Sequence, residues 1–545
     1  MKTEGGLITP ISSNQLPGDS PQGEQKPFRS ILFPEPISRS DIDTQEAPEF
    51  FIDLNLDQIV ASITANRDEY NLKPFFYTPL KNVDAIYYRY EVLRDLDNVG
   101  VFECIRSFAD SMRSMRSHLF QAKKLYYKRQ KQAWFLDAVE VYCNGVRRLG
   151  RDLTNAELGS RGFQAFHDFL REYAESPRFL SLAGETEKLK TDLSGIRYSL
   201  QIHGKRIKAA KYNSEPDYSA EVLEIFNKFK QGAPREYRFE FHSTADMNHV
   251  EAAVLDLVAQ LFPETFSFLD EYCNRHSGFL DATIAGFDRE VQFYMACVEY
   301  AARFKQAGLS LCHPALSDHS KEIYARDAFD LALANRLVQD KTPVVTNDLH
   351  LKTPERIFIV SGPNQGGKTT FARMFGQLHY LASIGCPVPA REAKLFLFDQ
   401  LFTHFEREEE LRNLTGKLED ELLRIRRILE RASPRSILIM NESFLSTTLD
   451  DALFLSKQIM ERIISLDVLC VSVTFLDELA SLGKTTVSMV STVNPEDPVL
   501  RTFKIIRRPA DGLAYAAAIA EKHRLTYSNV RSQIAENAGE ERSAS

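Results

Sequence analysis

Gly362 is followed, after four residues, by Gly367, Lys368 and Thr369, which is the spacing of a phosphate-binding loop. Glycines let backbone N–H groups approach a phosphate where a Cβ atom would collide with it. The lysine ammonium can bind the β- and γ-phosphates, and the threonine hydroxyl can bind Mg²⁺. An apolar run precedes the loop and an amphipathic helical segment follows it, so the pattern predicts an ATP and Mg²⁺ site. The predicted nucleotide-binding residues are Gly362, Pro363, Asn364, Gln365, Gly366, Gly367, Lys368, Thr369 and Thr370.

A second motif is the apolar run 437–440, which ends in Asn441 and Glu442. P-loop enzymes place an acid at the end of a neighbouring strand, beside the metal and the attacking water. We therefore predict that Glu442 is the catalytic residue and that Thr369 and Asn441 bind the metal. Asparagine offers an oxygen but no charge, so this site has one negative charge fewer than an aspartate would give. The alternative for Glu442 is a solvated carboxylate at the end of a strand.

Basic residues form local clusters in a chain whose net charge is −8, so contact with DNA would have to come from such a cluster. One lies on a helix predicted for residues 112–133, and another lies on a predicted hairpin. Their charges could neutralise phosphates without reading sequence, or could form an ordinary solvated surface. The aromatic residues Phe120, Tyr126 and Tyr127 are expected in the core. The predicted DNA-binding residues are Arg113, Arg116, Lys123, Lys124, Lys128, Arg129, Lys131, Lys205, Arg206 and Lys208, with a third cluster at residues 228–238.

The chain of 545 residues is too long for one core, and its composition and hydrophobic periodicity change along its length. Residues 1–48 and 528–545 are polar and are predicted to be disordered. Residues 49–308 have mainly helical periodicity, interrupted by an alternating pattern with a turn near Gly204 that predicts a hairpin. In residues 309–527 short β-branched runs alternate with helical segments, which predicts a mostly parallel sheet with helices on both faces. The expected fold is multidomain, with a mainly α-helical half followed by an α/β P-loop domain.

Composition points to a protein of the cytoplasm. The seven cysteines have neither the spacing of a zinc site nor that of a disulfide framework, so we expect reduced thiols. The first residues do not resemble a secretory signal, and no apolar window is long enough to predict a membrane span.

Several of these segments resemble the MutS mismatch-repair family. Residues 362–370 read G-P-N-Q-G-G-K-T-T and are similar to the extended loop G-P-N-M-G-G-K-S-T of that family. I-G-C-P-V-P-A at 384–390 resembles its I-G-x-x-V-P-A, and V-T-N-D at 345–348 resembles its V-P-N-D. The P-L-K-N-V-D-A-I run at 79–86 resembles the start of the family's lever domain. The resemblance covers about residues 50–525 and implies an ABC-like ATPase domain, a helical lever with a small clamp, and a homodimer that grips DNA.

The chain also departs from the family pattern. Asn441 replaces a metal-associated aspartate, and Phe475 stands where the family has a histidine that senses the γ-phosphate. The family's Gly-Arg-Gly is absent at 444–446, and the loop that completes a partner's site can be placed near residues 411–421 by Gly416 and Glu421 alone. The two mismatch-sensing domains that precede the lever in other members have no room before residue 50, so recognition of mispaired bases by those domains is not expected.

The resemblance therefore implies an ATP-binding protein, with or without hydrolysis, that acts on mismatched, branched or otherwise altered DNA in repair or recombination. The alternative from another class is a nucleotide-gated scaffold that has lost hydrolysis, as Asn441 and Phe475 suggest. A small-molecule kinase using the same loop is a third reading, with no substrate pocket evident in the helical half.

Overall fold

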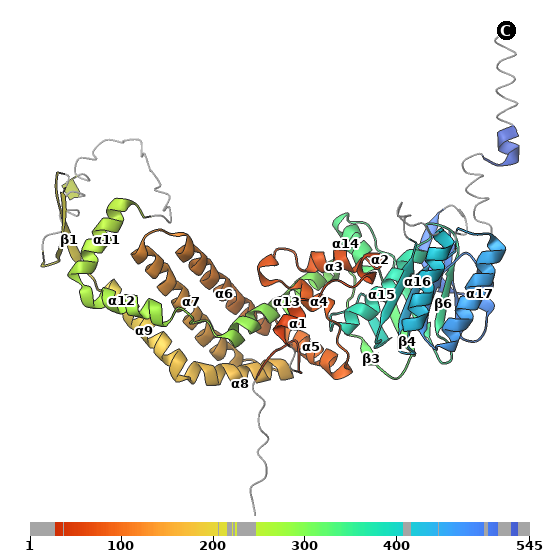
Figure 1. Cartoon of the computed structure of the whole chain (residues 1–545), viewed down its shortest axis with the longest axis horizontal. Coiled ribbons are helices and arrows are strands. Elements are labelled where there is room, and N and C mark those ends of the chain that lie inside the picture. The colour runs from red at the N-terminus through yellow and green to blue at the C-terminus, as the bar shows by residue number, and fades with distance from the viewer. Residues whose placement is uncertain are drawn as a thin grey trace, which may run out of the picture.

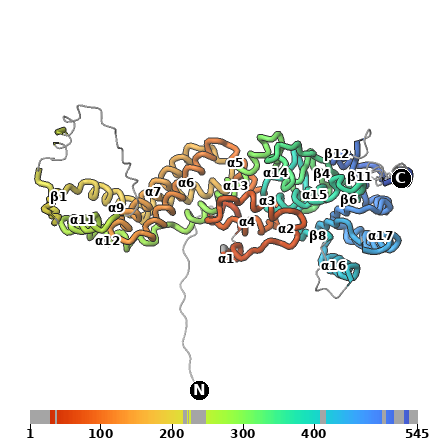
Figure 2. The backbone as a smooth tube through the Cα atoms, turned by 90° about the horizontal axis from the view of Figure 1, so that it is seen from above, coloured from red at the N-terminus to blue at the C-terminus, as the bar shows by residue number. Residues whose placement is uncertain are grey.

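The computed structural model describes residues 28–35, 38–204, 206–214, 221, 224–225, 247–406, 416–444, 446–494, 500–510 and 525–531. The molecule is elongated and curved, with helices and a small hairpin at one end and an α/β unit at the other (Figure 1). Seen from above, the red N-terminal helices and α13 (Ala282–Gln306) lie between these two ends (Figure 2). The expected order, a mainly helical half followed by a part with mixed sheets, is therefore present.

The first half is built from helices that begin at polar caps. Asn248 and Glu251 form a capping box at the start of α11, and the Asp281 side chain accepts from the first backbone N–H groups of α13. Besides α13, the helices of this half are α1 (Arg39–Asp43), α2 (Phe50–Asp53), α3 (Leu56–Ile63), η1 (Asp68–Tyr70), α4 (Lys73–Tyr77), α5 (Val83–Leu96), α6 (Val99–Lys124), α7 (Lys128–Thr154), α8 (Arg161–Glu175), α9 (Pro177–Ser194), α11 (His249–Leu261) and α12 (Pro263–Arg275).

The predicted hairpin is confirmed. Strands β1 (Tyr198–His203) and β2 (Arg206–Lys211) pair in antiparallel register, from Tyr198 opposite Lys211 to His203 opposite Arg206. Gly204 in the turn has a φ of 61°, a conformation that glycine adopts without strain.

The helix predicted for residues 112–133 is in fact two helices. α6 ends at Lys124, α7 begins at Lys128, and the two run side by side (Figure 1). Leu125 is extended, with a ψ of 156°, and its side chain is buried. The prediction was wrong because no glycine or proline marks this turn, and helical periodicity continues on both sides of it.

The predicted disordered arm, residues 1–48, is wrong for its last part, while residues 1–27 lie outside the described residues. Ile31, Leu32 and Phe33 are 0%, 0% and 5% exposed. The Glu290 carboxylate accepts a 2.8 Å hydrogen bond from the Ile31 N–H, and the Tyr294 hydroxyl donates to the Ile31 carbonyl. Three apolar residues are too few to show periodicity, and side chains far along the chain satisfy their backbone groups.

The second half contains two sheets. The larger has the order β12-β11-β6-β10-β9-β8, in which every pair is parallel except β11 with β12, and the smaller is a mixed sheet of order β3-β7-β4-β5. The mostly parallel sheet is thus confirmed, and the second sheet was not predicted. Their strands are β3 (Ala315–Ser317), β4 (Ile323–Ala328), β5 (Asn347–Leu351), β6 (Ile357–Ser361), β7 (Glu392–Phe396), β8 (Leu401–Phe405), β9 (Ile437–Asn441), β10 (Leu469–Val473), β11 (Thr486–Val493) and β12 (Arg501–Arg507).

Helices cover both faces of the larger sheet, and alternation along its strands decides which side chains face which helix. In β6, Phe358 and Val360 belong to the large buried cluster with α15, whereas Ile357 and Ile359 belong to a second cluster with α16 and α17. In β9, Ile437 and Ile439 face α15 in the same way. The helices of this half are α14 (Leu331–Gln339), α15 (Lys368–Ser383), α16 (Lys417–Arg431), α17 (Leu449–Ser465) and η2 (Asp477–Ser481).

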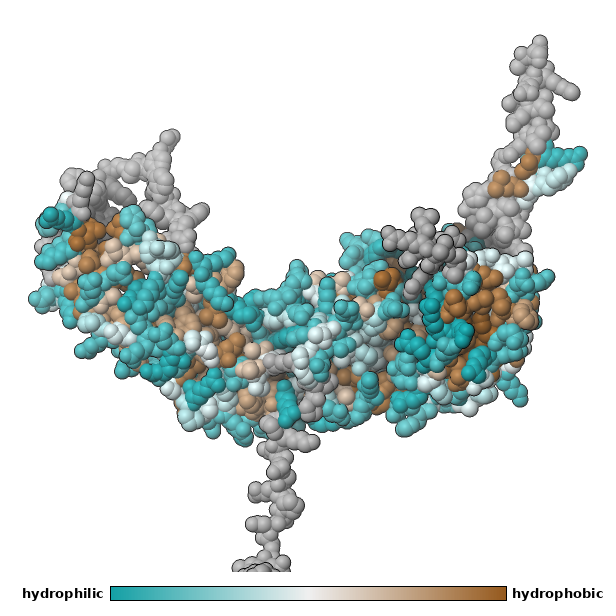
Figure 3. Space-filling model, viewed as in Figure 1, coloured by the Kyte–Doolittle hydropathy of each residue, from teal (hydrophilic) through white to brown (hydrophobic). Residues whose placement is uncertain are grey.

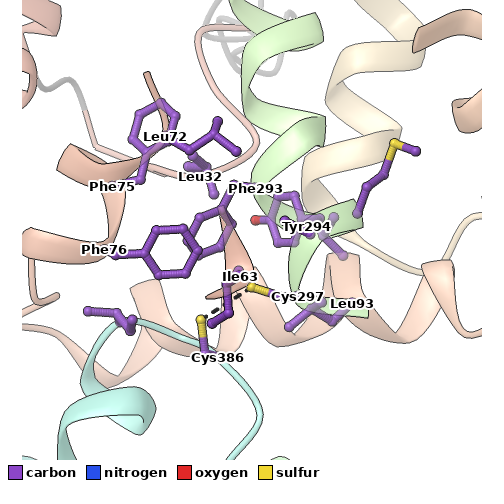
Figure 4. Close-up of a cluster of buried hydrophobic side chains, with 14 of the residues drawn as sticks. Leu32, Ile63, Leu72, Phe75, Phe76, Leu93, Phe293, Tyr294, Cys297 and Cys386 are labelled. Atoms are coloured by element: carbon purple, nitrogen blue, oxygen red, sulfur yellow. Dashed lines mark hydrogen bonds between the residues drawn. The ribbon is translucent and has the colours of Figure 1, made fainter. Parts of the chain in front are cut away.

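The two halves share one buried core (Figure 4). The ring of Phe76 on α4 lies 4.7 Å from that of Phe293 on α13, and Cys297 on α13 has its Sγ 3.5 Å from the Sγ of Cys386, just beyond α15. All seven cysteines are free thiols, as expected.

Arg89 on α5 is fully buried at this junction. Its Nε donates to the Leu32 carbonyl at 3.0 Å, and its Nη1 donates to the Ile384 carbonyl at the end of α15 at 2.6 Å. Burial lowers the pKa of Arg89. Gly385 has a φ of 69°, and a Cβ there would lie 2.7 Å from the Arg89 Cδ, so the chain can pass Arg89 at this point because the residue is glycine.

No single helix in the described part of the chain is long and apolar enough to cross a membrane. The helices α11 and α12 meet the length and hydropathy requirements only when taken together, and they are bent by 108° relative to each other.

Candidate nucleotide site and nucleic-acid surface

The phosphate-binding loop connects β6 to α15 and is held from behind by β11. Gly367, which precedes α15, has a φ of 92°. The Ser491 hydroxyl of β11 donates to the Gly366 carbonyl at 2.7 Å, and a Cβ on Gly366 would lie 2.3 Å from that hydroxyl oxygen. β11 pairs with β6, so the sheet itself brings Ser491 under the loop. Loop backbone and helix N-terminus are therefore placed together, as binding of a phosphate requires.

Lys368 points into this loop and is 5% exposed. Its Nζ lies 3.0 Å from the Gly362 carbonyl oxygen, 3.1 Å from Asn364 Oδ1 and 3.7 Å from Glu442 Oε1. Burial lowers the pKa of Lys368, and the neighbouring Glu442 opposes this effect. The ammonium thus occupies the centre of the loop, bonded to acceptors that phosphate oxygens could replace.

Asn441 is brought to the loop by strand alternation. It follows Ile437 and Ile439 on the face of β9 that packs against α15, and its Oδ1 accepts a 2.9 Å hydrogen bond from the Thr369 hydroxyl. Glu442, the next residue, has a φ of 54°, and its carboxylate reaches toward Lys368. Three predicted site residues, Thr369, Asn441 and Glu442, thus meet at one edge of the sheet.

These donors fit Mg²⁺. Thr369 and Asn441 offer a hydroxyl and an amide oxygen, which are oxygen ligands of the kind that Mg²⁺ takes together with phosphates and water. Within the described residues no group of three His, Cys, Asp or Glu side chains is placed to hold a metal ion.

A buried carboxylate supports the turn that follows Glu442. Glu421 on α16 accepts a 2.9 Å hydrogen bond from the N–H of Phe444, whose φ is 64°, and lies 3.2 Å from His404 Nε2 on β8. Burial alone would raise the pKa of Glu421, but the bonds from His404 and Phe444 hold it below its usual value. Glu421 therefore fixes the backbone two residues beyond the predicted catalytic acid.

Sequence reasoning did not find three neighbours of the site. Ser491 could be found only from the strand order, because nothing local connects it with Gly366. The same holds for His404, which reaches Glu421 across the sheet surface. Phe503 on β12 has an exposed ring, and its Cβ is 3.9 Å from the position of a Cβ on Gly367. Phe475, noted for its type, follows β10 and is 46% exposed.

Seven of the predicted DNA-binding residues lie between residues 113 and 131, on α6, α7 and their connection. Some of these seven form ion pairs within the chain, and the others are exposed. Arg116 pairs with Asp288, and Arg113 lies 3.6 Å from Glu69. Lys128 and Arg129 both bind Asp270, at 2.9 and 2.6 Å. Lys123, Lys124 and Lys131 are exposed. Four of the seven predicted DNA contacts thus hold helices together within the chain.

The expectation that aromatic residues of this cluster lie in the core is wrong for two of them. Phe120 and Tyr126 are 55% and 87% exposed. The expectation fails because Phe120 lies near the end of α6 and Tyr126 lies in the connection to α7, and there both side chains face outward.

On the hairpin, Arg206 and Lys208 are exposed and share one face of β2. Lys205 and the predicted cluster at 228–238 lie outside the described residues.

Comparison with known families agrees with this layout. Residues 81–307 match the family described as MutS2 N-terminal domain, and residues 358–526 match MutS domain V. The second match contains the loop, β9 and Ser491.

Individual proteins give the same result. DNA mismatch repair protein MutS of Chlorobium phaeobacteroides is 24% identical over 372 residues, which are 66% of this chain and 40% of that protein. MutS of Thermotoga neapolitana is 24% identical over 59% of this chain and 38% of its own length. MutS of Halalkalibacterium halodurans is 30% identical over 32% of this chain and 21% of its own. The chain matches less than half the length of each of these relatives. The two family matches, together with the geometry of the loop, show that this chain belongs to the MutS family.

Proposed function

We propose that the chain binds Mg-ATP at residues 362–370 and uses the bound nucleotide to control its grip on mismatched, branched or otherwise altered DNA. The observation that carries the proposal is the meeting of β9 with the loop, where Thr369 bonds to Asn441 at 2.9 Å and Lys368 lies 3.7 Å from Glu442. The MutS relatives, named as DNA mismatch repair proteins, support the DNA part.

Each residue has a separate task in this proposal. The loop N–H groups and Lys368 bind the β- and γ-phosphates, and Thr369 and Asn441 hold Mg²⁺, which neutralises charge on the phosphates. Glu442 orients the water that attacks the γ-phosphorus as the bond to the β–γ bridging oxygen breaks, giving ADP and phosphate. Phe503, whose backbone and Cβ lie beside Gly367, supports the nucleobase with its exposed ring. Two chains form a homodimer in which the nucleotide sites change the distance between the helical arms.

Nucleotide binding is tested by titrating a fluorescent ATP analogue into the full chain with Mg²⁺. Lys368→Ala should weaken binding by roughly ten- to a hundredfold, since a hydrogen bond to a charged group is lost. The matched control is Lys352→Ala, an exposed lysine just after β5, which should bind as the parent does. Unaltered affinity in Lys368→Ala would overturn the proposal.

DNA binding is tested by a filter assay that compares duplex, mismatched and branched DNA with and without Mg-ATP. We expect preference for altered DNA and an affinity that changes with nucleotide. Light scattering on the same samples measures whether a dimer forms. If the protein binds none of the three DNAs, with or without Mg-ATP, the proposal of DNA binding is overturned. The proposal of nucleotide binding is unaffected by that result.

A second candidate is a nucleotide-gated scaffold that does not hydrolyse ATP. The neutral Asn441 beside Thr369 and the exposed ring of Phe475, in place of a histidine, favour it. ATP turnover that disappears in Glu442→Ala would exclude the scaffold, whereas ATP binding without turnover in the parent protein would support it.

A further inference from the structure

The connection between α6 and α7 carries exposed aromatic rings. We call residues 120–131 the α6–α7 tip, and it lies at the end of the two helices that is away from α5 and α8 (Figure 1). Tyr126 is 87% exposed and packs edge-on against Tyr127 at 5.2 Å, while Phe120 is 55% exposed. Most of the surface in view is hydrophilic, and apolar side chains gather in a few places (Figure 3). Large exposed aromatic rings are unfavourable in water, so a pair of them at one turn indicates a binding surface.

Lysines stand among these rings. The Lys124 Nζ lies 4.1 Å from the centre of the Phe120 ring, and Lys123 and Lys131 are exposed nearby. In the described part of the chain no carboxylate lies within ion-pairing distance of these three ammonium groups. The tip therefore combines aromatic faces with net positive charge.

The base of the tip is held firmly. Leu125 is buried, and Lys128 and Arg129 bind Asp270 of α12, which also accepts a 2.7 Å hydrogen bond from Gln132. These contacts fix the start of α7 against α12. The rings and lysines are thus presented on a scaffold that loses little freedom on binding.

Exposed rings next to ammonium groups suit a nucleotide strand, in which a flat base and a phosphate alternate. Aromatic side chains stack on bases of any sequence, and lysines neutralise the backbone. In a closed duplex the base faces are covered by their neighbours, so such rings can reach only bases that are unpaired.

We propose that the α6–α7 tip binds unpaired nucleotides of DNA, such as a bulge or a single strand at a junction. Phe120 and Tyr126 stack on the bases, while Lys123, Lys124 and Lys131 contact the phosphates. This inference rests on the DNA-binding part of the proposed function and narrows its substrate to DNA with extrahelical or single-stranded bases.

The test measures fluorescence anisotropy of the full chain with three labelled DNAs: a closed duplex, the same duplex with a bulge of three unpaired nucleotides, and one single strand. The double variant Phe120→Ala/Tyr126→Ala should weaken binding to the bulge and the single strand by about ten- to a hundredfold and leave the duplex within about twofold. The double variant Lys123→Ala/Lys124→Ala should weaken binding to all three and lower the slope against log salt by roughly 1.5. The control is Phe454→Ala, a 63% exposed ring on α17.

A second measurement reports stacking directly. A bulge carrying 5-iododeoxyuridine should crosslink under ultraviolet light to Phe120 or Tyr126, as mass spectrometry of the digested complex would identify. Thermal melting of each variant checks that the fold is kept, as expected for exposed side chains.

The outcomes separate the two proposals. Parent protein that binds all three DNAs, with no selective loss in the aromatic variant and no crosslink at the tip, overturns the tip while the DNA function stands. Parent protein that binds none of them overturns both.

Discussion

The guanidinium of Arg89 donates a 2.6 Å hydrogen bond to the carbonyl of Ile384, the residue that caps the C-terminal end of α15. The other end of α15 begins at Lys368 in the nucleotide site. One helix thus connects the phosphate loop with a buried charge on α5 of the helical half. A rigid element with nucleotide at one end and lever at the other is the physical connection that coupling between sites needs.

Replacing Arg89 should therefore be costly. In Arg89→Met the carbonyls of Leu32 and Ile384 lose their donors while remaining buried, and we expect the free energy of unfolding to fall by about 2–5 kcal/mol. Urea denaturation followed by circular dichroism measures this. Arg106→Met, which removes a half-exposed ion pair with Glu103, should change stability by less than about 1 kcal/mol. If the two variants lose the same free energy of unfolding, the buried hydrogen bonds of Arg89 contribute no more to stability than an exposed ion pair does.

Asn441→Asp should strengthen metal binding. The new carboxylate would stand beside the Thr369 hydroxyl, adding a negative charge next to Mg²⁺, and we expect roughly tenfold tighter Mg²⁺ binding in the presence of ATP. Without Mg²⁺ the same charge repels the phosphates, so ATP alone should bind more weakly. Calorimetric titration of Mg²⁺ and of ATP distinguishes the two effects. Gln58→Glu, an exposed position on α3, is the charge-matched control.

Replacing Glu421 should lower the rate of ATP turnover and should change the affinity for ATP much less. Glu421→Ala leaves the buried N–H of Phe444 without an acceptor, which costs about 1–3 kcal/mol and loosens the turn that carries Glu442. We expect a lower kcat for ATP with an unchanged KM, and partial recovery in Glu421→Gln, which keeps an acceptor oxygen. The exposed Glu419 of the same helix provides the control, Glu419→Ala. If the parent has no turnover, hydrogen exchange at residues 442–444 gives the same comparison.

Two histidines, His379 in the buried interior and the partly buried His313, should make folding sensitive to acid. Burial lowers the pKa of His313 and of His379 to about 4. The unfolded chain takes up protons near pH 6.5 and the folded chain does not, so stability is complete above about pH 6.5 and falls as pH drops toward 4. Between pH 7 and pH 5 each histidine should cost about 2 kcal/mol.

Denaturation at both pH values measures this cost. His313→Phe, which can still stack on Tyr90, should reduce the loss of stability between pH 7 and pH 5 by about 2 kcal/mol. His319→Asn, at a side chain that is 91% exposed, should leave it unchanged. A pH effect that persists in full in His313→Phe would contradict the prediction.

The parts of the site that could be predicted are local in the chain. Strand, loop and helix at 357–383 follow one another, so residue types alone place Lys368 at the loop. Asn441 could be placed by the period of a strand. Ser491 and His404 could not, because their contacts depend on the order of β11, β6, β9 and β8 in the sheet, which the periodicity of one strand does not contain.

Burial was hardest to predict where the chain turns or where a segment is short. Ile31 and Leu32 are buried without any periodic pattern, because side chains of α5 and α13 satisfy their backbone groups. Phe120 and Tyr126 have core-like types but lie where a helix ends. Apolar type indicates burial only when neighbouring elements are known.

The buried cluster that runs from Ile31 through α13 and α15 to Ile505 has a consequence for the whole molecule. A protease cut near residue 309 would separate the lever from the ATPase part in sequence but leave them joined through their common interior. The two fragments should therefore copurify and melt in one cooperative transition, because the largest buried cluster takes residues from both of them.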